Sequence, residues 1–363
     1  MNATRLCVLL CSLALWGWVA SCGPKETTGT EVKPEPTPPT GTPYTWTKPA
    51  NFPEPVYDFE NNQLTKEGVA LGRTLFYDAM LSKDGTISCA FCHSPFTAFS
   101  HTDHPLSHGI RDQTGTRNVP GIFNTAWQTS FFWDGGIFDL DLLPISPIQN
   151  PVEMGDSLGN VLKKVRNSGR YRPLFRAAYG TDSVTSERFL KALSQFMLTM
   201  VSANSGYDKF VRKEANAALP AAAQRGLTLF QAKCASCHKE PFFTDQSFRN
   251  NGLAKLTGAK FDDLGRGAIS GQAADNYKFR VPSLRNIEFT PPYMHDGRFS
   301  TLQQVLRHYA TGVQDTPQLD PLLKQNGQVG IPMTQQEQND IITFLLTLTD
   351  YSFISNPDLQ PLR

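Results

Sequence analysis

The sequence carries almost no net charge of either sign. Its 363 residues include 34 Lys and Arg against 33 Asp and Glu, a formal charge of +1. A chain this close to neutral has no electrostatic reason to bind nucleic acid. The apolar run near its start, residues 6–19, is too short to cross a bilayer, which takes about 20 residues. We therefore expect neither nucleic-acid binding nor a membrane-spanning helix.

The cysteine count of seven is odd and does not suit a simple disulfide framework. Arg5, the apolar run and small residues up to Ser21 predict a signal peptide over 1–21. The sequence Val-Ala-Ser-Cys that ends at Cys22 resembles a bacterial lipobox, in which that cysteine is acylated and becomes the mature N-terminus. Ordinary cleavage beside an incidental cysteine is the alternative. The lipobox predicts a periplasmic protein that only acyl chains hold on a membrane of the bacterial cell envelope.

Residues 22–46 are rich in Pro, Thr, Gly and Glu and show no apolar periodicity. This composition is typical of an extended, disordered tether. We therefore expect the folded body to begin at residue 47.

The four remaining cysteines form two C-x-x-C-H motifs, at 89–93 and 234–238. This motif attaches c-type haem: two thiols one helical turn apart add to the two vinyl groups, and the adjacent histidine ligates the iron. A split zinc site and a redox dithiol are the alternatives, but two copies in an exported chain favour haem. The sequence thus predicts two covalent haem c groups, held by Cys89, Cys92 and His93 and by Cys234, Cys237 and His238.

A repeat accompanies the two motifs. The sequence G-x-T-L-F stands at 72–76 before the first and at 226–230 before the second. We expect a mainly α fold with two cytochrome-c-like helical domains, 47–205 and 206–355, each with one haem. Long irregular stretches at 94–150 and 239–300 are expected to carry function. An apolar stripe after Thr185 and a capping box at Thr334-x-x-Glu337 predict two further helices.

Candidates for a second ligand of the second haem lie downstream of its motif. The sequence Ser300-x-x-Gln303 is expected to cap a helix whose apolar stripe includes Tyr309, with His308 pointing away from that stripe. Spacing alone leaves Met294, His295 and Tyr309 as candidates. For the tyrosine, a buried core position is the alternative.

Several short motifs then occur in a characteristic order: Ser107-His108-Gly109, Arg117-Asn118-x-Pro120, Phe132-Trp133-Asp134-Gly135, Glu153-Met154 and Pro-Tyr-Met-His-Asp-Gly at 292–297. Together with the two haem motifs they resemble the bacterial di-haem cytochrome c peroxidase family, which includes the MauG-type enzymes. The resemblance covers about residues 50–350. It implies that the N-terminal haem is peroxidatic and that the C-terminal haem transfers electrons.

The resemblance also implies roles for individual residues. Trp133 matches an electron relay between the haems, with plain aromatic packing as the alternative. Glu153 matches the carboxylate that shuttles the peroxide proton, and Pro147 a proline of the distal pocket. His108 matches a loop histidine that caps the peroxidatic iron in the resting form and swings away on activation.

A calcium site between the domains is implied as well. Asn118 and the backbone carbonyls of Thr290 and Pro292 match its ligands. An oxygen-only ligand set suits a hard cation.

Two positions depart from the peroxidase pattern. The family's distal glutamine falls on Leu143, and the methionine ligand of the electron-transfer haem falls on Tyr309, as in the MauG-type enzymes. An oxygen ligand favours higher oxidation states than methionine does.

Three functions remain open at this point. The first is reduction of hydrogen peroxide with electrons from a small exported c-type cytochrome or similar donor. The second is MauG-like oxidation of residues in a partner protein, and the third is electron transfer without catalysis. Glu153 and His108 argue against the third, because a pure carrier needs no open haem with acid–base groups. Formation of a homodimer is left open.

Overall fold

The computed structural model describes residues 40–256, 262–325 and 327–362. The predicted signal peptide, Cys22 and the tether up to residue 39 lie outside these residues. In the described part of the chain, no helix is both long and apolar enough to cross a membrane.

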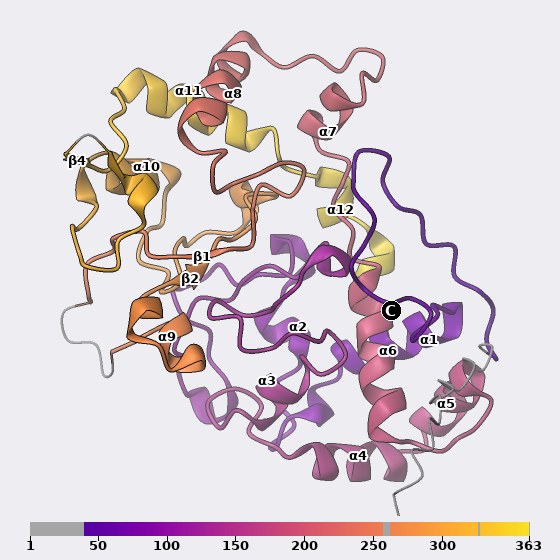
Figure 1. The fold of residues 1–363 in the computed structure, drawn as a ribbon. Coiled ribbons are helices and arrows are strands. Elements are labelled where there is room, and N and C mark those ends of the chain that lie inside the picture. The colour runs from indigo at the N-terminus through magenta and orange to yellow at the C-terminus, as the bar shows by residue number, and fades with distance from the viewer. Residues whose placement is uncertain (1–39, 257–261, 326, 363) are drawn as a thin grey trace, which may run out of the picture. The chain divides into compact units, whose positions relative to one another are not determined.

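The fold is mainly α, as predicted, with long irregular connections (Figure 1). The helices before residue 200 are α1 (Lys66–Phe76), α2 (Cys89–Cys92), α3 (Ile145–Gln149), α4 (Leu158–Asn167), α5 (Tyr171–Tyr179) and α6 (Ser186–Leu198). Those after it are α7 (Gly206–Val211), α8 (Ala221–Lys233), α9 (Arg266–Ser270), α10 (Leu302–Arg307), α11 (Gln335–Leu346) and α12 (Tyr351–Ile354). Two antiparallel pairs of very short strands complete it: β1 (Phe248–Arg249) with β2 (Phe279–Arg280), and β3 (Lys324–Gln325) with β4 (Gln328–Val329).

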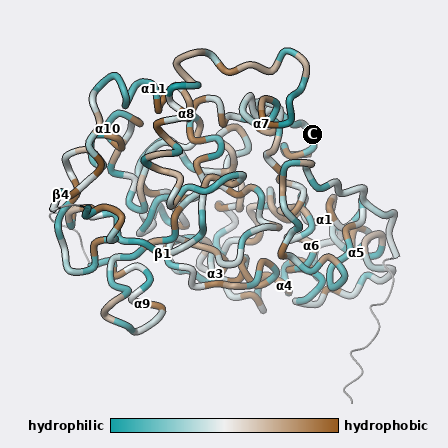
Figure 2. The backbone as a smooth tube through the Cα atoms, turned by 45° about the horizontal axis from the view of Figure 1, so that its top comes forward, coloured by the Kyte–Doolittle hydropathy of each residue, from teal (hydrophilic) through white to brown (hydrophobic). Residues whose placement is uncertain are grey.

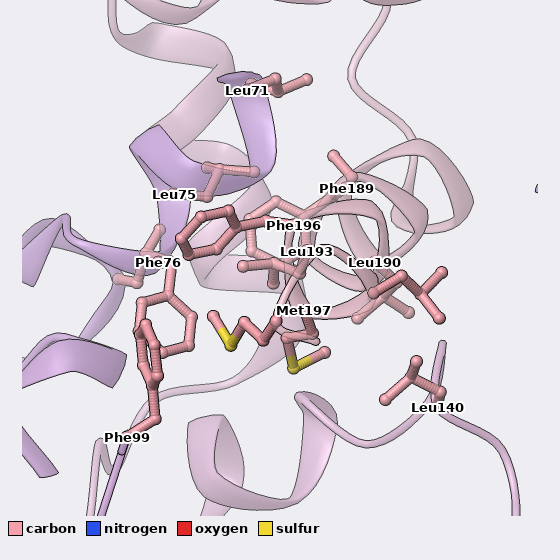
Figure 3. Close-up of a cluster of buried hydrophobic side chains, with 14 of the residues drawn as sticks. Leu71, Leu75, Phe76, Phe99, Leu140, Phe189, Leu190, Leu193, Phe196 and Met197 are labelled. Atoms are coloured by element: carbon pink, nitrogen blue, oxygen red, sulfur yellow. The ribbon is translucent and has the colours of Figure 1, made fainter. Parts of the chain in front are cut away.

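The first hydrophobic core forms where α1 crosses α6. Leu71, Leu75 and Phe76 of α1 point towards the apolar stripe of α6 (Figure 3). Thr185 caps α6 by accepting a hydrogen bond from the backbone N–H of Arg188, as predicted. Burial of these side chains is the main force that holds the two helices together.

The second core repeats this arrangement with α8 and α11. The rings of Phe230 and Phe344 lie 5.1 Å apart across the crossing, as those of Phe76 and Phe196 lie 5.4 Å apart in the first core. The predicted capping box at Thr334 is present at the start of α11. Figure 2 shows hydrophobic residues on the helices of both cores. The G-x-T-L-F repeat therefore marks equivalent helices in two equivalent helix pairs.

Residues 40–46 do not follow the tether prediction. The indole of Trp46 lies 5.5 Å from that of Trp127, and its Nε1–H donates to the carbonyl of Leu198. Thr42 donates through its backbone and its side chain to the carboxylate of Glu67. The folded body thus includes this segment, because aromatic packing and hydrogen bonds hold it.

The C-terminal segment also departs from the predicted domain limits. Phe353, Ile354 and Leu359 pack in the first core, although 206–355 was assigned to the second domain. The side chain of Arg73 donates to the carbonyls of Pro357 and Gln360. In Figure 1 this yellow end of the chain lies beside α1 and α6.

A buried ion pair links α7 to the segment that follows β2. Arg285 donates to both carboxylate oxygens of Asp208, at 2.8 and 2.7 Å, and both side chains are almost fully buried. Arg285 also donates to the carbonyls of Ser202 and Pro241. Such a pair is well satisfied as long as both partners are present.

Candidate functional site

The first C-x-x-C-H motif holds its histidine by a backbone contact. Cys89 and Cys92 lie on the single turn of α2, and Nδ1 of His93 lies 2.7 Å from the carbonyl oxygen of Phe99. Burial lowers the pKa of His93 to about 4, so the ring is neutral. With Nδ1–H donating to the carbonyl, Nε2 is free to bind a metal ion, the usual arrangement for a ligating histidine.

The second motif reproduces this geometry. Nδ1 of His238 lies 3.0 Å from the carbonyl oxygen of Phe243, and burial lowers the pKa of the ring. Burial also raises the pKa of the Cys89 and Cys234 thiols to about 12. A redox dithiol needs a thiol with a lowered pKa. The thiols therefore do not fit the dithiol alternative.

The split zinc site finds no support either. In the described ranges, no group of three or more His, Cys, Asp or Glu side chains is placed to hold a metal ion.

A large cavity surrounds the second motif. It leaves about 2070 Å³ free of protein atoms, its open mouth included, and Cys234, Cys237 and His238 line it. Arg280 projects from its wall, where desolvation lowers the pKa of the guanidinium to about 10. Among the described residues this arginine is in no ion pair, and its Nε donates only to the carbonyl of Phe132. A half-buried, partly desolvated cation without an anion fits a haem, whose propionates would supply the missing charge.

Trp133 and the three predicted calcium ligands line the same cavity. The indole Nε1–H of Trp133 donates to the carbonyl of Asn118 at 2.8 Å, and its own carbonyl accepts from the backbone of Arg280 at 2.7 Å. The tryptophan thus bridges a loop of the first half and strand β2 of the second. Asn118 donates from Nδ2 to the carbonyl of Pro105 at 3.0 Å. Thr290 and Pro292 line the same cavity.

The ligand candidates Met294, His295 and Tyr309 all line this cavity, whereas His308 does not. The helix before Tyr309, α10, begins one residue later than predicted, because Thr301 and Gln304 form the capping box in place of Ser300 and Gln303.

Tyr309 lies on a π turn, His308–Gly312, which follows α10 directly. Such turns often occur at functional sites. His308 is buried on the other side, with Nε2 lying 3.0 Å from the carbonyl of Asn251. The side chain of the same asparagine lies 3.5 Å from the sulfur of Met294. Burial raises the pKa of Tyr309 to about 12, and a hydrogen bond with Asn251 opposes this shift.

Glu153 lies beside the first motif. Its Oε1 accepts from Nδ2 of Asn150 at 2.6 Å, and its charge contributes to the raised pKa of the Cys92 thiol. Burial raises the pKa of Glu153, while the hydrogen bond from Asn150 opposes the shift. Sequence reasoning did not find Asn150, although its spacing of three residues from the glutamate is compatible with a contact. Pro147 lies on α3, three residues before Asn150, and its carbonyl accepts a hydrogen bond from the backbone N–H of Met154.

His108 belongs to a cluster of three histidines that sequence reasoning also missed. Its Nδ1 contacts the carboxylate of Asp112, and its ring lies 4.6 Å from that of His104. Nε2 of His104 lies 3.2 Å from Nε2 of His101. The backbone carbonyl of His108 lies 4.0 Å from the sulfur of Cys92, so this loop adjoins the first motif.

Leu143 packs against the first core. At this position, where the resemblance places a glutamine, the chain therefore has an apolar contact and no hydrogen-bond donor.

Comparisons with known proteins identify the family of this chain. Residues 66–216 match the family described as di-haem cytochrome c peroxidase. Methylamine utilization protein MauG of Methylorubrum extorquens is 36% identical over 307 residues, covering 82% of each chain. Cytochrome c551 peroxidase of Nitrosomonas europaea is 35% identical over 80% of this chain and 83% of its own length.

A solved structure has a similar fold. The crystal structure of a MauG-like protein associated with microbial copper homeostasis is 32% identical, with a TM-score of 0.77 over 88% of this chain and 99% of that one. The resemblance inferred from the motifs is confirmed: this chain belongs to the di-haem cytochrome c peroxidase family, whose members carry two haem c groups.

Proposed function

We propose that the protein reduces hydrogen peroxide to water at its N-terminal haem site, with electrons relayed from the C-terminal site. The observation that carries the proposal is a half-buried carboxyl group, that of Glu153, beside the first C-x-x-C-H motif. Cys89, Cys92 and His93 would hold a haem there, and its iron would supply the site that binds peroxide and the redox chemistry. The carboxylate takes a proton from the near oxygen of peroxide and returns one to the far oxygen, so that water leaves.

A raised pKa suits this double role. A group that both accepts and donates a proton works best when its pKa is near the working pH. Burial shifts the pKa of Glu153 in that direction, and the hydrogen bond from Asn150 holds the carboxyl group in one orientation. His108 would cap the iron in a resting form and leave on activation, and Pro147 would line the distal side.

Trp133 is proposed as the electron relay. Its indole lines the C-terminal cavity and donates to the carbonyl of Asn118, and its backbone carbonyl accepts from the backbone N–H of Arg280. The donor would be a small exported c-type cytochrome or a similar protein. Calcium bound by Asn118, Thr290 and Pro292 would link the two halves of the protein.

MauG-like oxidation of residues in a partner protein is the second candidate. It is favoured by Tyr309, which lines the C-terminal cavity at the position where the peroxidases have methionine, and by the similarity to proteins named MauG. A tyrosine oxygen on the second iron would favour higher oxidation states over the ferrous form.

One assay separates the candidates. Steady-state peroxide consumption is measured with a reduced c-type cytochrome, with and without prior reduction of the enzyme. Turnover that oxidises the cytochrome supports the peroxidase proposal. Peroxide-dependent haem oxidation without cytochrome turnover contradicts it and favours the second candidate.

We also propose a periplasmic location with an acyl anchor on Cys22. The variant Cys22→Ala should move from the membrane to the soluble exported fraction with its haem content unchanged. Membrane retention after signal cleavage would contradict the anchor.

A further inference from the structure

An unbroken series of aromatic rings leads away from the C-terminal cavity. Trp127 lines that cavity, and its ring lies 5.5 Å from that of Trp46. Phe59 follows at 4.6 Å from Trp46, and Tyr57 at 5.2 Å from Phe59. The series ends on the half-buried ring of Tyr57, in a segment whose neighbours Val56 and Asp58 are exposed.

The two indoles differ from the tyrosine in what holds their protons. Nε1–H of Trp127 donates to the carbonyl of Pro53 at 2.9 Å, and that of Trp46 to the carbonyl of Leu198 at 3.0 Å. A backbone carbonyl is not a base, so an oxidised indole here keeps its proton and its positive charge. That charge is readily neutralised by an electron from the next ring.

Tyr57 is the position where a proton can leave. Its hydroxyl donates to Oδ1 of Asp141 at 2.8 Å, and it accepts a hydrogen bond from Asn62 at 2.9 Å. Burial and the charge of Asp141 raise the pKa of the phenol, so it is protonated at neutral pH. Oxidation of this tyrosine therefore moves its proton to the carboxylate at the same time.

We propose that Trp127, Trp46 and Tyr57 form an electron path between the C-terminal haem site and the surface of the first half, with the Tyr57–Asp141 pair as its terminus. Hydrogen peroxide is the oxidant. One electron passes from Trp127 to the oxidised haem site, Trp46 refills Trp127, and Tyr57 refills Trp46. The hydroxyl proton moves to Asp141, which leaves a neutral tyrosyl radical that an electron-rich aromatic group at the surface can reduce.

This path does not include Trp133, which bridges the two halves through its hydrogen bonds with Asn118 and Arg280. It rests on the proposed function only for the source of the oxidising equivalents. A donor that reaches Tyr57 would need no access to either haem.

The test uses the full-length protein with both haems, mixed with stoichiometric hydrogen peroxide in the absence of any donor and frozen rapidly. Electron paramagnetic resonance then reports protein radicals, and ring-deuterated tyrosine identifies a tyrosyl signal by its loss of proton hyperfine splitting. Optical spectra of the same samples report oxidation of the haems. We expect a tyrosyl signal in the wild type that is lost in Tyr57→Phe and in Trp127→Phe.

Tyr171→Phe is the matched control. Tyr171 is also buried and also donates its hydroxyl to a carboxylate, that of Asp78, but it lies on α5 and has no ring contact with the tryptophans among the described residues. The tyrosyl signal should persist in this variant.

In Asp141→Asn the tyrosyl signal should be lost and replaced by a tryptophan radical, because the proton acceptor is gone.

The outcomes separate this path from the proposed function. Haems that peroxide does not oxidise would contradict the proposed function. Haems that are oxidised normally, with a radical signal that is unchanged in Tyr57→Phe and Trp127→Phe, would overturn the path alone. Loss of the signal in Tyr171→Phe would also overturn it.

Discussion

The α-carbon of Gly72 lies directly against the backbone carbonyl of Ala192. A Cβ at this position would lie 1.8 Å from that oxygen, far inside van der Waals contact. Gly226 has the same relationship to the carbonyl of Asp340, at 1.9 Å. The glycine of each G-x-T-L-F sequence is therefore what allows the two helices of each core to cross closely.

Gly72→Ala and Gly226→Ala should each destabilise the protein, because the obstructing atom is backbone and the helices must move apart. Overpacking of this kind costs about 1–3 kcal/mol. Gly159→Ala is the control, since Gly159 lies in α4 with nothing within 4 Å of an added Cβ. That change should stabilise the protein by about 0.5–1 kcal/mol through helix propensity. Denaturant unfolding measures the free energy of unfolding of all three variants. Equal changes in the two core variants and in Gly159→Ala would contradict the inference that the glycines allow the helices to cross closely.

The variant Arg285→Met should be strongly destabilising, because it leaves the carboxylate of Asp208 buried without its partner. Breaking a buried pair costs about 3–5 kcal/mol. The exposed pair Arg176–Asp182 offers a control, and Arg176→Met should cost no more than about 1 kcal/mol. Similar losses of stability in thermal or denaturant unfolding would show that the buried pair stabilises the fold no more than an exposed pair does.

The same pair predicts a dependence of stability on pH. Burial alone would raise the pKa of Asp208, but the hydrogen bonds from Arg285 outweigh it and hold the pKa below its usual range. The resulting stabilisation is fully present above the unfolded pKa of about 3.9 and is lost as pH falls through the lower folded value. As the pH falls through this range, the free energy of unfolding of the wild type should therefore decrease. This decrease should be absent from Arg285→Met. An unchanged acid limb in that variant would contradict the argument.

Glu153→Gln should lower peroxide turnover by about 100-fold or more, since general acid–base catalysis contributes about 10² to 10⁴. The resting optical spectrum should barely change. Glu187→Gln removes an exposed carboxylate on α6 and should leave turnover unaffected. Near-wild-type turnover in Glu153→Gln would exclude this carboxylate from the mechanism.

Asn150→Ala tests how the pKa of the Glu153 carboxyl group is set. The hydrogen bond from Asn150 lowers the pKa of Glu153, so its removal should raise the pKa further. If turnover needs the carboxylate form, the acidic limb of its pH profile should move to higher pH. A shift of this limb to lower pH, or no shift, would show that Asn150 does not tune the carboxyl group that takes part in the reaction.

Tyr309→Met should raise the reduction potential of the C-terminal haem, because methionine stabilises ferrous iron relative to an oxygen ligand. Tyr293→Phe is the control: this tyrosine lines the same cavity, but its hydroxyl donates to the carbonyl of Ile287. Electron paramagnetic resonance of the oxidised protein and a redox titration measure both variants. Unchanged signals and potential in Tyr309→Met would make Tyr309 a core residue.

Covalent attachment has its own test. A pyridine haemochrome assay should find two haems c per chain, and acid–acetone should extract neither. The variants Cys89→Ala and Cys237→Ala should each lose one thioether link. Extractable haem in the wild type would contradict attachment at the two motifs.

Features that depend on short-range spacing could be predicted from the sequence. The haem motifs, the cap of α6 and the capping box of α11 each involve residues a few positions apart, so their chemistry is visible in the chain. Spacing also placed Tyr309 on the cavity side, although the helix there begins one residue later and ends in a π turn. Family resemblance added the functional names, because the order of several motifs is more specific than any one of them.

Contacts between distant segments could not be predicted in this way and are seen only in the folded chain. Trp46 looked like part of a tether until Trp127 gave it a partner, and the residues after 350 returned to the first core. The close approach of Gly72 to Ala192, and the isolation of Arg280 in the cavity wall, likewise depend on residues far apart in the chain. Packing and desolvation are set by all neighbours in space, and a local pattern records only the neighbours in sequence.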